Sequence, residues 1–364
     1  MKIMKTTHQK TAYTFCLYVL LILCSHLTFA QKPQKENSNC VSEAEQSYRS
    51  GQIEDIRSKL PACLENSRVT AETRIRGYRL LAITYLYFNE NQEAEKYMKL
   101  LLKMDPEYKV DENQDPPEFI QLYGTFRTKP ILLFGLHVGL NSSFVHVQNN
   151  YSLDNTSTSL GKYSSGIGIT GGISVEFAIW DHLSLITGLD YQTTQYEYQK
   201  EQFGYSTLDY LEKSTWVGLP VGAKFYITNS KFRLYTQATL SFQYLLSANA
   251  TPSRSDNMGE ILGNQTVVGP SIDILAQREK LNMLIDFGLG FNWKGIVGPG
   301  YFTGLISYSY GLINVANPTT RFDNTELIYD YNYVSNDFSL NSFSLKLGYA
   351  IPIYKPKVLK RKTN

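Results

Sequence analysis

One pattern repeats through residues 131–354: apolar residues alternate with small polar residues in eight separate stretches. In the first stretch Leu132 and Leu136 fall on one face of a strand, whereas Gly135 and His137 fall on the other, because successive side chains of a strand point to opposite faces. Stretches of this kind are typical of a barrel that crosses a bilayer. The sequence therefore predicts a membrane all-β fold, an eight-stranded antiparallel up-and-down barrel.

The connections between the stretches indicate which way the barrel faces. The expected strands cover residues 131–147, 165–180, 182–197, 214–227, 231–247, 280–293, 300–313 and 339–354. Short connections follow the second, fourth and sixth strands, and long polar connections follow the first, third, fifth and seventh. Bacterial outer-membrane barrels place short turns in the periplasm and long loops outside. We therefore expect an outer-membrane barrel whose two ends, and the region before it, lie on the periplasmic side.

The second face of each strand separates a membrane barrel from a soluble sandwich or lipocalin, which would also alternate. A soluble barrel exposes that face to water and tends to carry Lys and Glu there, but the second stretch carries Gly166, Gly168, Thr170 and Ser174. Small neutral residues suit a narrow enclosed interior. The opposite face, which includes Ile167, then needs lipid or a second sheet, and a soluble all-β fold stays open as the alternative.

Nearly all charged residues of the strands fall on interior positions: His137, Glu176, Asp190, Lys224, Arg233, Asp286 and Lys346. Counted from the short turns, Glu176, Lys224 and Arg233 lie near the periplasmic end, and the others lie about mid-height. Acids and bases can neutralise one another in a narrow lumen, where unpaired charges are costly. Eight strands leave little width for an aqueous channel. We therefore favour a charge-paired polar plug over a proton or ion path.

The N-terminus indicates export. Basic residues precede an apolar run at residues 12–23, and Thr28-Phe29-Ala30 offers a cleavage site, so we expect the mature chain to begin at Gln31. Cys24 follows the bulky Leu23, which argues against a lipoprotein signal. No other segment approaches ~18 continuous apolar residues, the length of a membrane-spanning helix.

Two cysteines, Cys40 and Cys63, remain after removal of the signal, in an oxidising compartment. Cys40 lies at the start of one predicted helix and Cys63 just past the end of the next. Antiparallel packing of these helices would bring the two thiols together, so we expect a disulfide there.

Helical periodicity replaces the strand pattern between residues 40 and 129. The small, aromatic and large apolar positions of a tetratricopeptide repeat are matched by Ala82, Tyr85, Ala94, Met98, Leu101 and Pro106. Residues 72–104 therefore resemble one such helical hairpin. Residues 44–60 look like a degenerate copy, in which Pro61 should end the second helix early.

A last helix is expected after Asp115, with Asp115 as its cap, prolines in its first turn and Glu118 closing a capping box. The hairpins and this helix would form a small solenoid with a concave face. Its groove, lined around Tyr78, Tyr85 and Tyr97, is expected to bind a periplasmic or envelope protein. The alternative is a stalk that only packs against the barrel.

The sequence offers little for catalysis. Of the histidines that remain after processing, His146 lies near the outer rim on the lipid-facing side, with Ser142 on the same strand but too far along it for direct contact. We expect no catalytic residues, no cofactor and no metal site, since no phosphate-binding loop or metal-spaced Cys/His cluster is present. The formal net charge of +2 gives no reason to expect a nucleic-acid partner.

Two segments of the barrel carry a resemblance to a known family. The segment at 217–226, with Leu219-Pro220 and Lys224, and the closing segment at 344–349 are similar to the PorT-like outer-membrane β-barrel domain widespread in Bacteroidota. The resemblance covers roughly residues 131–354 and excludes the helical region. Members of this group share no catalytic activity, so the resemblance implies a protein that is not an enzyme.

We therefore expect a non-enzymatic outer-membrane barrel, in contact with outer-membrane lipid, that anchors a periplasmic helical adaptor for envelope organisation, secretion or uptake. The alternatives are a lipid-modifying outer-membrane enzyme that uses His146, and a surface receptor that acts through its long external loops. The expected divisions are a signal peptide at 1–30, a flexible lead-in at 31–39, a tetratricopeptide-like domain at 40–129, a barrel at 130–354 and a basic periplasmic tail at 355–364.

Overall fold

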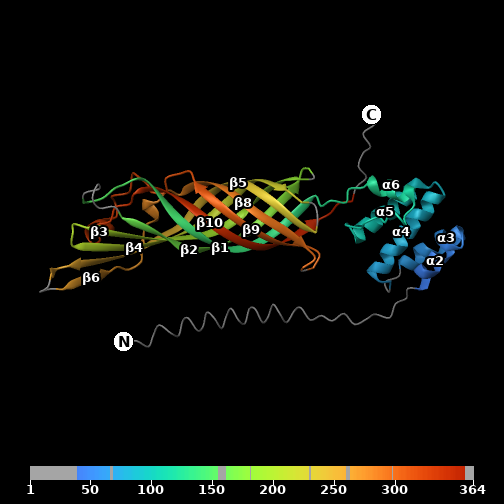
Figure 1. The fold of residues 1–364 in the computed structure, drawn as a ribbon, viewed down its shortest axis with the longest axis horizontal. Helices are drawn as coiled ribbons and strands as arrows, with labels where there is room; N and C mark the ends of the chain where they lie inside the picture. The colour runs from blue at the N-terminus through green and yellow to red at the C-terminus, as the bar shows by residue number, and fades with distance from the viewer. Residues whose placement is uncertain are drawn as a thin grey trace, which may run out of the picture. The chain divides into compact units, whose positions relative to one another are not determined.

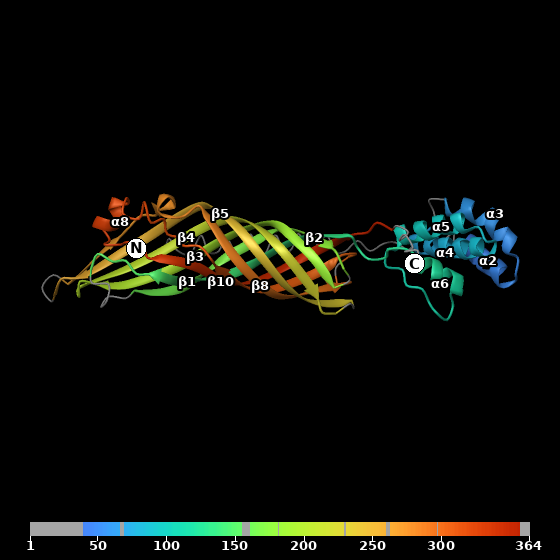
Figure 2. The same cartoon turned by 90° about the horizontal axis from the view of Figure 1, so that it is seen from above.

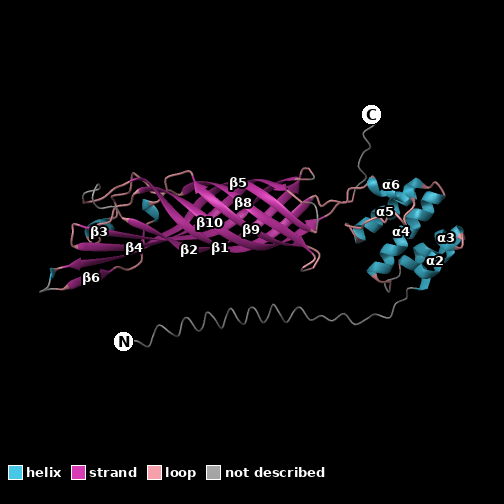
Figure 3. Ribbon diagram, viewed as in Figure 1, coloured by secondary structure: helices cyan, strands magenta, loops and turns pink. Residues whose placement is uncertain are grey.

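The computed structural model describes residues 39–65, 69–154, 161–180, 182–228, 231–259, 263–296 and 298–356. Contacts divide the chain into two compact units, and the boundary in the sequence lies between Phe126 and Arg127. Helices make up the first unit and strands dominate the second (Figure 3). The predicted signal peptide lies outside the described residues, as do the lead-in apart from Asn39 and the tail apart from residues 355 and 356.

The first unit contains α2 (Asn39–Arg49), α3 (Ile53–Leu64), α4 (Ala71–Tyr87), α5 (Asn91–Met104) and α6 (Pro117–Gly124). Helix α4 begins where the Thr70 hydroxyl accepts a hydrogen bond from the Thr73 backbone N–H at 3.2 Å, which satisfies one of the free N–H groups of a helix start. It ends before Asn89, whose φ of 61° turns the chain into α5. The hairpin predicted at 72–104 is therefore present as α4 and α5.

Small and large apolar residues alternate in the core of this unit. Ala82, Ala94, Met98 and Leu101 are completely buried. Gly77 lets α4 approach α3 closely, because a Cβ at this position would lie 2.5 Å from Leu64 Cδ2. The residues that match the repeat pattern are thus core residues, and burying them is the main source of stability for helices of this length.

Two local predictions for the helices are wrong. Pro61 lies inside α3, which continues to Leu64; burial of Leu60 and Leu64 on the same face favours continuation over the cost of one missing hydrogen bond. Asp115 does not cap α6. Its carboxylate instead accepts hydrogen bonds from Arg79 Nε at 2.7 Å and from the Asp111 N–H at 2.7 Å.

Cys40 and Cys63 form a disulfide that joins the start of α2 to the end of α3, with their Cα atoms 6.6 Å apart.

The second unit is an antiparallel ring of eight strands (Figure 1). They are β1 (Leu132–Asn149), β2 (Lys162–Ala178), β3 (Leu183–Gln202), β4 (Ser206–Tyr226), β5 (Phe232–Asn257), β8 (Leu281–Lys294), β9 (Tyr301–Gly311) and β10 (Asp337–Ile353). Each pairs with the next along the chain, and β10 closes the ring on β1 in a register from Leu132↔Ile353 to Asn149↔Asp337.

Near the short connections, the outer surface of the ring is apolar and its inner surface is polar. Outward residues such as Val138 and Ile167 are 70 % and 72 % exposed. Inward residues such as Asn141, Ser184 and Asn292 are buried. Among the described helices, none has both the length and the apolar character needed to cross a bilayer.

Several strands extend well beyond this apolar band (Figures 1 and 2). The long loop predicted at 199–213 is instead a continuous hairpin, in which Gln202 pairs with Ser206 across a turn at Phe203 and Gly204. Smaller elements at this end are β6 (Asn264–Val268), β7 (Ile272–Asp273), the 3-10 turn η1 (Leu275–Gln277) and α8 (Thr325–Tyr329). Pairing continues there because alternation of apolar and polar residues also continues.

A first prediction concerns the disulfide. Cys63→Ser should lower the free energy of unfolding of the helical unit by about 3 kcal/mol, since the lost cross-link would release a loop with a sequence separation of 23 residues. Urea titration of the full-length protein in detergent, followed by far-UV circular dichroism at the helical band, measures this. Ser50→Ala, an exposed change in the same hairpin, is the control; equal stability of the two variants would contradict the stabilising role.

Candidate functional site

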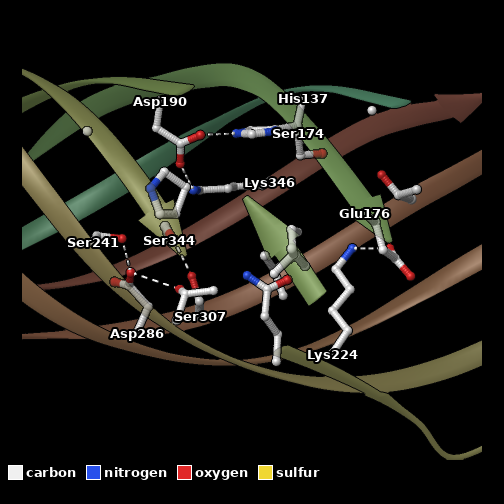
Figure 4. A pocket seen from close by; sticks show the side chains of 18 of the residues that line it. His137, Ser174, Glu176, Asp190, Lys224, Ser241, Asp286, Ser307, Ser344 and Lys346 are labelled. Carbon is white, nitrogen blue, oxygen red and sulfur yellow. Dashed lines mark hydrogen bonds and ion pairs between the residues drawn. The ribbon is translucent and has the colours of Figure 1, made fainter. Parts of the chain in front are cut away.

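The barrel encloses a chamber of about 90 Å³ whose lining comes from all eight strands of the ring (Figure 4). Such a volume holds only a few water molecules. Charged and hydroxyl side chains line it, and buried layers lie on both sides of it. The chamber and its two layers are the candidate functional site.

An ion-paired group lies at the middle of the chamber wall (Figure 4). Lys346 Nζ donates to Asp190 Oδ2 at 2.8 Å, and His137 Nε2 lies 3.2 Å from Asp190 Oδ1. Gly172 faces Asp190 across the sheet, where a Cβ would lie only 2.6 Å from the Asp190 carboxylate. The glycine thus makes room for the acid, and Lys346 compensates its charge.

Asp286 is held differently. Its carboxylate accepts hydrogen bonds from the hydroxyls of Ser241 and Thr239, the latter at 3.2 Å. Ser307 and Ser344 hydrogen bond to each other at 2.7 Å in the same chamber. Hydroxyl groups therefore take the place of a basic partner for this acid.

The layer toward the short connections is built around Glu176. Lys224 Nζ donates to Glu176 Oε2 at 3.1 Å and Tyr226 donates to Glu176 Oε1 at 2.6 Å. Asn292 donates to the Tyr226 hydroxyl at 3.0 Å, and Lys224 lies over the ring of Tyr235, 4.6 Å from its centre. All five residues are buried, so this layer closes the lower end of the chamber.

The layer toward the long connections is built around a buried ion pair that links β4 to the segment before β8. Arg278 Nε donates to Glu212 Oε1 at 2.8 Å, and its Nη2 binds the other carboxylate oxygen. The hydroxyls of Tyr196 and Tyr210 also donate to Glu212, the latter at 2.9 Å. A carboxylate with this many donors is well compensated despite its complete burial.

The segment between β9 and β10 folds into the mouth of the barrel and completes this upper layer. Arg278 Nη1 donates to Ser335 Oγ at 2.9 Å, Asn336 donates to the Tyr163 hydroxyl at 2.9 Å, and Tyr333 stacks on Tyr210 with ring centres 3.9 Å apart. Burial raises the pKa of Tyr333 above its usual value, although the nearby Arg278 guanidinium opposes the rise. The mouth is thus filled by protein.

The structure brings together most of the charged residues predicted for the lumen, in two groups. His137, Asp190 and Lys346 form one group, and Glu176 and Lys224 form the other. Neutralisation among all of them was expected, but Asp286 is bound by hydroxyls and Arg233 lies over the ring of Tyr301, 5.2 Å from its centre. Neither Asp286 nor Arg233 forms an ion pair with another described residue.

The tyrosines predicted to line a helical groove are packing residues. Tyr85 and Tyr97 are each only 8 % exposed and stack with ring centres 5.3 Å apart, and Tyr78 is half-buried beside Tyr97. Large aromatic rings at these spacings bury more area inside the hairpin than on its surface. A cavity of about 300 Å³ in this unit is lined by none of these three tyrosines; its lining consists of Tyr48, Ile83, Leu86, Tyr87, Asn89, Pro116 and Glu118.

The residues that sequence reasoning missed are Glu212 and Arg278. Both were assigned to external loops, where a charge is usually solvated. The available signal was the run Tyr196, Tyr198, Leu208 and Tyr210, which places large side chains on the inner face of β3 and of β4, the strand that carries Glu212. An acid inside an aromatic face requires a partner.

The described residues contain no cluster of three or more His, Cys, Asp or Glu side chains able to hold a metal ion. His146 is exposed, and in this part of the chain no hydrogen bond links it to Ser142. Across the strand pair it faces Ser339, whose buried hydroxyl has no hydrogen-bond partner among the described residues. Among the described residues, no hydrogen bond joins His146 to either serine.

Comparison with known proteins gives a family match and several similar folds. A family model described as outer membrane protein beta-barrel domain matches residues 121–317. The attachment invasion locus protein Ail of Yersinia pestis is 14% identical, with 61% of this chain and 99% of that chain covered and a TM-score of 0.25. OprG from Pseudomonas aeruginosa is 9% identical, with 62% and 98% covered and a TM-score of 0.31. No curated protein matches the chain.

A second prediction concerns the lower layer. Lys224→Met should lower barrel stability by about 3–5 kcal/mol, because it leaves Glu176 buried without its cation. The temperature at which the folded band disappears on a detergent gel reports this. Lys213→Met, an exposed change on the same strand, should alter stability by no more than about 0.5 kcal/mol. Equal melting of the two variants would contradict the pairing.

A third prediction concerns the upper layer. Arg278→Met should free the segment 331–338 and make its amides exchange faster with solvent, measured by hydrogen–deuterium exchange, whereas the exposed Lys280→Met should not. Conductance in planar bilayers should remain at background in both variants, because the Glu176 layer still closes the chamber. Porin-sized conductance of the Arg278 variant would show that the lower layer is no barrier.

Proposed function

This chain belongs to the outer membrane protein beta-barrel domain family, and we propose that it is a non-enzymatic outer-membrane protein whose closed barrel anchors a periplasmic helical adaptor. The observation that carries the proposal is the pair of buried layers around Glu176 and Glu212, which leave a chamber of only about 90 Å³ between them. A barrel closed in this way offers no path for a solute. Its function then resides in the parts of the chain outside the bilayer.

The orientation follows from chain connectivity and from the rule for this class of barrel. The chain enters the ring at Leu132 and leaves it at Ile353, at the end that carries the short connections. Short turns face the periplasm in bacterial outer-membrane barrels. The helical unit, which precedes β1 directly, is then periplasmic.

The helical unit offers a surface suited to a partner protein. Its cavity of about 300 Å³ is lined by Tyr48, Leu86, Tyr87, Pro116 and Glu118, which come from α2, α4 and α6. These are the first helices of the two hairpins and the final helix, the elements that line the concave side of a tetratricopeptide-like solenoid. Tyr87 is 68 % exposed, and an exposed tyrosine beside a cavity is a common anchor in protein interfaces.

Two finer assignments belong to the same proposal. We place the barrel in the PorT-like group of Bacteroidota, on the segment 217–226 with its Leu219-Pro220 pair and Lys224. We also assign the adaptor to a complex for envelope organisation, secretion or uptake, since these processes join outer-membrane anchors to periplasmic partners.

A second candidate function, that of a surface receptor, is favoured by the tips of the extended hairpins. Phe203 and Tyr205 stack at the tip between β3 and β4, each 47 % exposed. Val268 on β6 is 72 % exposed nearby. Exposed apolar residues on projecting hairpins are a typical protein-binding feature.

A fourth prediction tests the orientation. An epitope tag inserted after Gly259, in the turn between β5 and β6, should bind antibody on intact cells. A tag after Asn364 should bind only after permeabilisation, because both ends of the barrel lie on the side of the short connections. Labelling of the C-terminal tag on intact cells would reverse the orientation.

A fifth prediction separates adaptor from receptor. Tyr87→Ala in the full-length chain should weaken partner capture after crosslinking in cell envelopes by roughly thirtyfold, equivalent to about 2 kcal/mol, because an aromatic anchor of this kind becomes buried when the partner binds. Tyr329→Ala is the matched control, since Tyr329 is 76 % exposed on α8 of the other unit. Loss of the partner only in the Tyr329 variant would favour the receptor.

Deletion of residues 40–104 provides the complementary test. A barrel satisfies its own backbone hydrogen bonds and should insert without the helices, so the truncated protein should be present in the outer membrane but fail to complement a deletion strain. Full complementation by the truncated barrel would rule out the adaptor.

A further inference from the structure

The outward face of the barrel is hollowed on one side. An apolar groove of about 670 Å³ runs across β4, β5, β8 and β9. Small outward residues lie at its centre: Ala223 pairs with Ala238, and Thr236 is the next outward residue on β5. Large side chains flank them, including Phe225 and Phe287, which are 53 % and 60 % exposed.

The groove follows two adjacent rows of cross-strand neighbours. One row passes through Phe225, Thr236 and Leu289, and the other through Ala223, Ala238 and Phe287. Outward positions on the far strands β1 and β2 carry mostly large apolar residues, such as Val138 and Ile167, with Gly171 opposite Val138 as an exception. The hollow therefore comes from a local choice of small residues.

We propose that this groove holds one acyl chain of a phospholipid. It is continuous with the apolar band that contacts the membrane, so acyl chains are the molecules that surround it. Within lipid the hydrophobic effect does not favour one apolar surface over another, and van der Waals contact decides which neighbours stay. A chain lying in the groove contacts protein atoms on more than one side, whereas a chain against a convex face has contacts on one side only.

The lower end of the groove identifies the lipid. It begins at Leu183 and Phe225, next to the short connection between β2 and β3. In the proposed orientation this end faces the periplasmic leaflet, whose lipids are phospholipids. This step rests on the proposed orientation, while the presence of an acyl chain in the groove does not.

Photo-crosslinking tests the proposal on the full-length protein. The protein is reconstituted into phosphatidylethanolamine/phosphatidylglycerol vesicles that contain a trace of phosphatidylethanolamine with a diazirine in one acyl chain. After irradiation, labelled residues are mapped by mass spectrometry. We expect several-fold more label on peptides carrying Ala223, Ala238 and Phe287 than on those carrying Val138 and Ile167, although the latter are at least as exposed.

Two variants give the test its control. Ala238→Leu fills the groove and should reduce its labelling several-fold, whereas Val138→Leu adds bulk to β1 and should not. Both changes face lipid, and heat-dependent gel mobility checks that the barrel has folded.

Uniform labelling of the wild-type protein, or equal labelling of both variants, would overturn the proposal. So would protein–protein crosslinks at Ala238 in place of lipid adducts, which would make a second copy of the chain the occupant. The vesicles are symmetric, so these results do not depend on the orientation, which the epitope tags test separately.

Discussion

Closure of the backbone hydrogen-bond ladder is the constraint on which the rest of this structure depends. In hydrocarbon an unpaired N–H or C=O group costs several kcal/mol, so a sheet in a bilayer must have no free edge. The continuous register between β1 and β10 removes that edge. Once eight strands close, the width of the interior is fixed. The side chains inside then have to fit and compensate one another within that space.

The interior meets this requirement with different chemistry at each level. Lys224 and Tyr226 compensate Glu176 at one end, Lys346 compensates Asp190 in the middle, and Arg278 with two tyrosines compensates Glu212 at the other end. Removing one member of such a group leaves a buried charge, whereas removing an exposed charge leaves nothing unpaired. The closed lumen is thus a consequence of charge pairing as well as of narrow width.

The sequence predicted the eight strands because a period of two is unambiguous where one face meets lipid. Prediction of strands from the sequence failed above the membrane, where the outer face of the barrel becomes polar and the inner face becomes apolar. On β3 the outward residues change from Leu189 and Tyr191 to Glu197 and Gln199, while inward tyrosines such as Tyr196 replace polar residues. The alternation itself persists, so the strands continue, but their outward residues have the polar composition that is expected of a loop. Packing of Arg278 against Glu212 joins distant segments and could not be deduced from local pattern.

This reversal also marks where the bilayer ends. The register pairs Tyr191 with Val217 and then Thr193 with Thr215, so outward residues change from apolar to polar at this level, with Leu211 on β4 as an exception. Beyond that level the outer face is polar and the aromatic side chains face inward, so the extension has an apolar core of its own that includes Trp216 and Phe338. A barrel needs no such core to span a membrane. The extension therefore serves the part of the barrel chain that lies outside the bilayer.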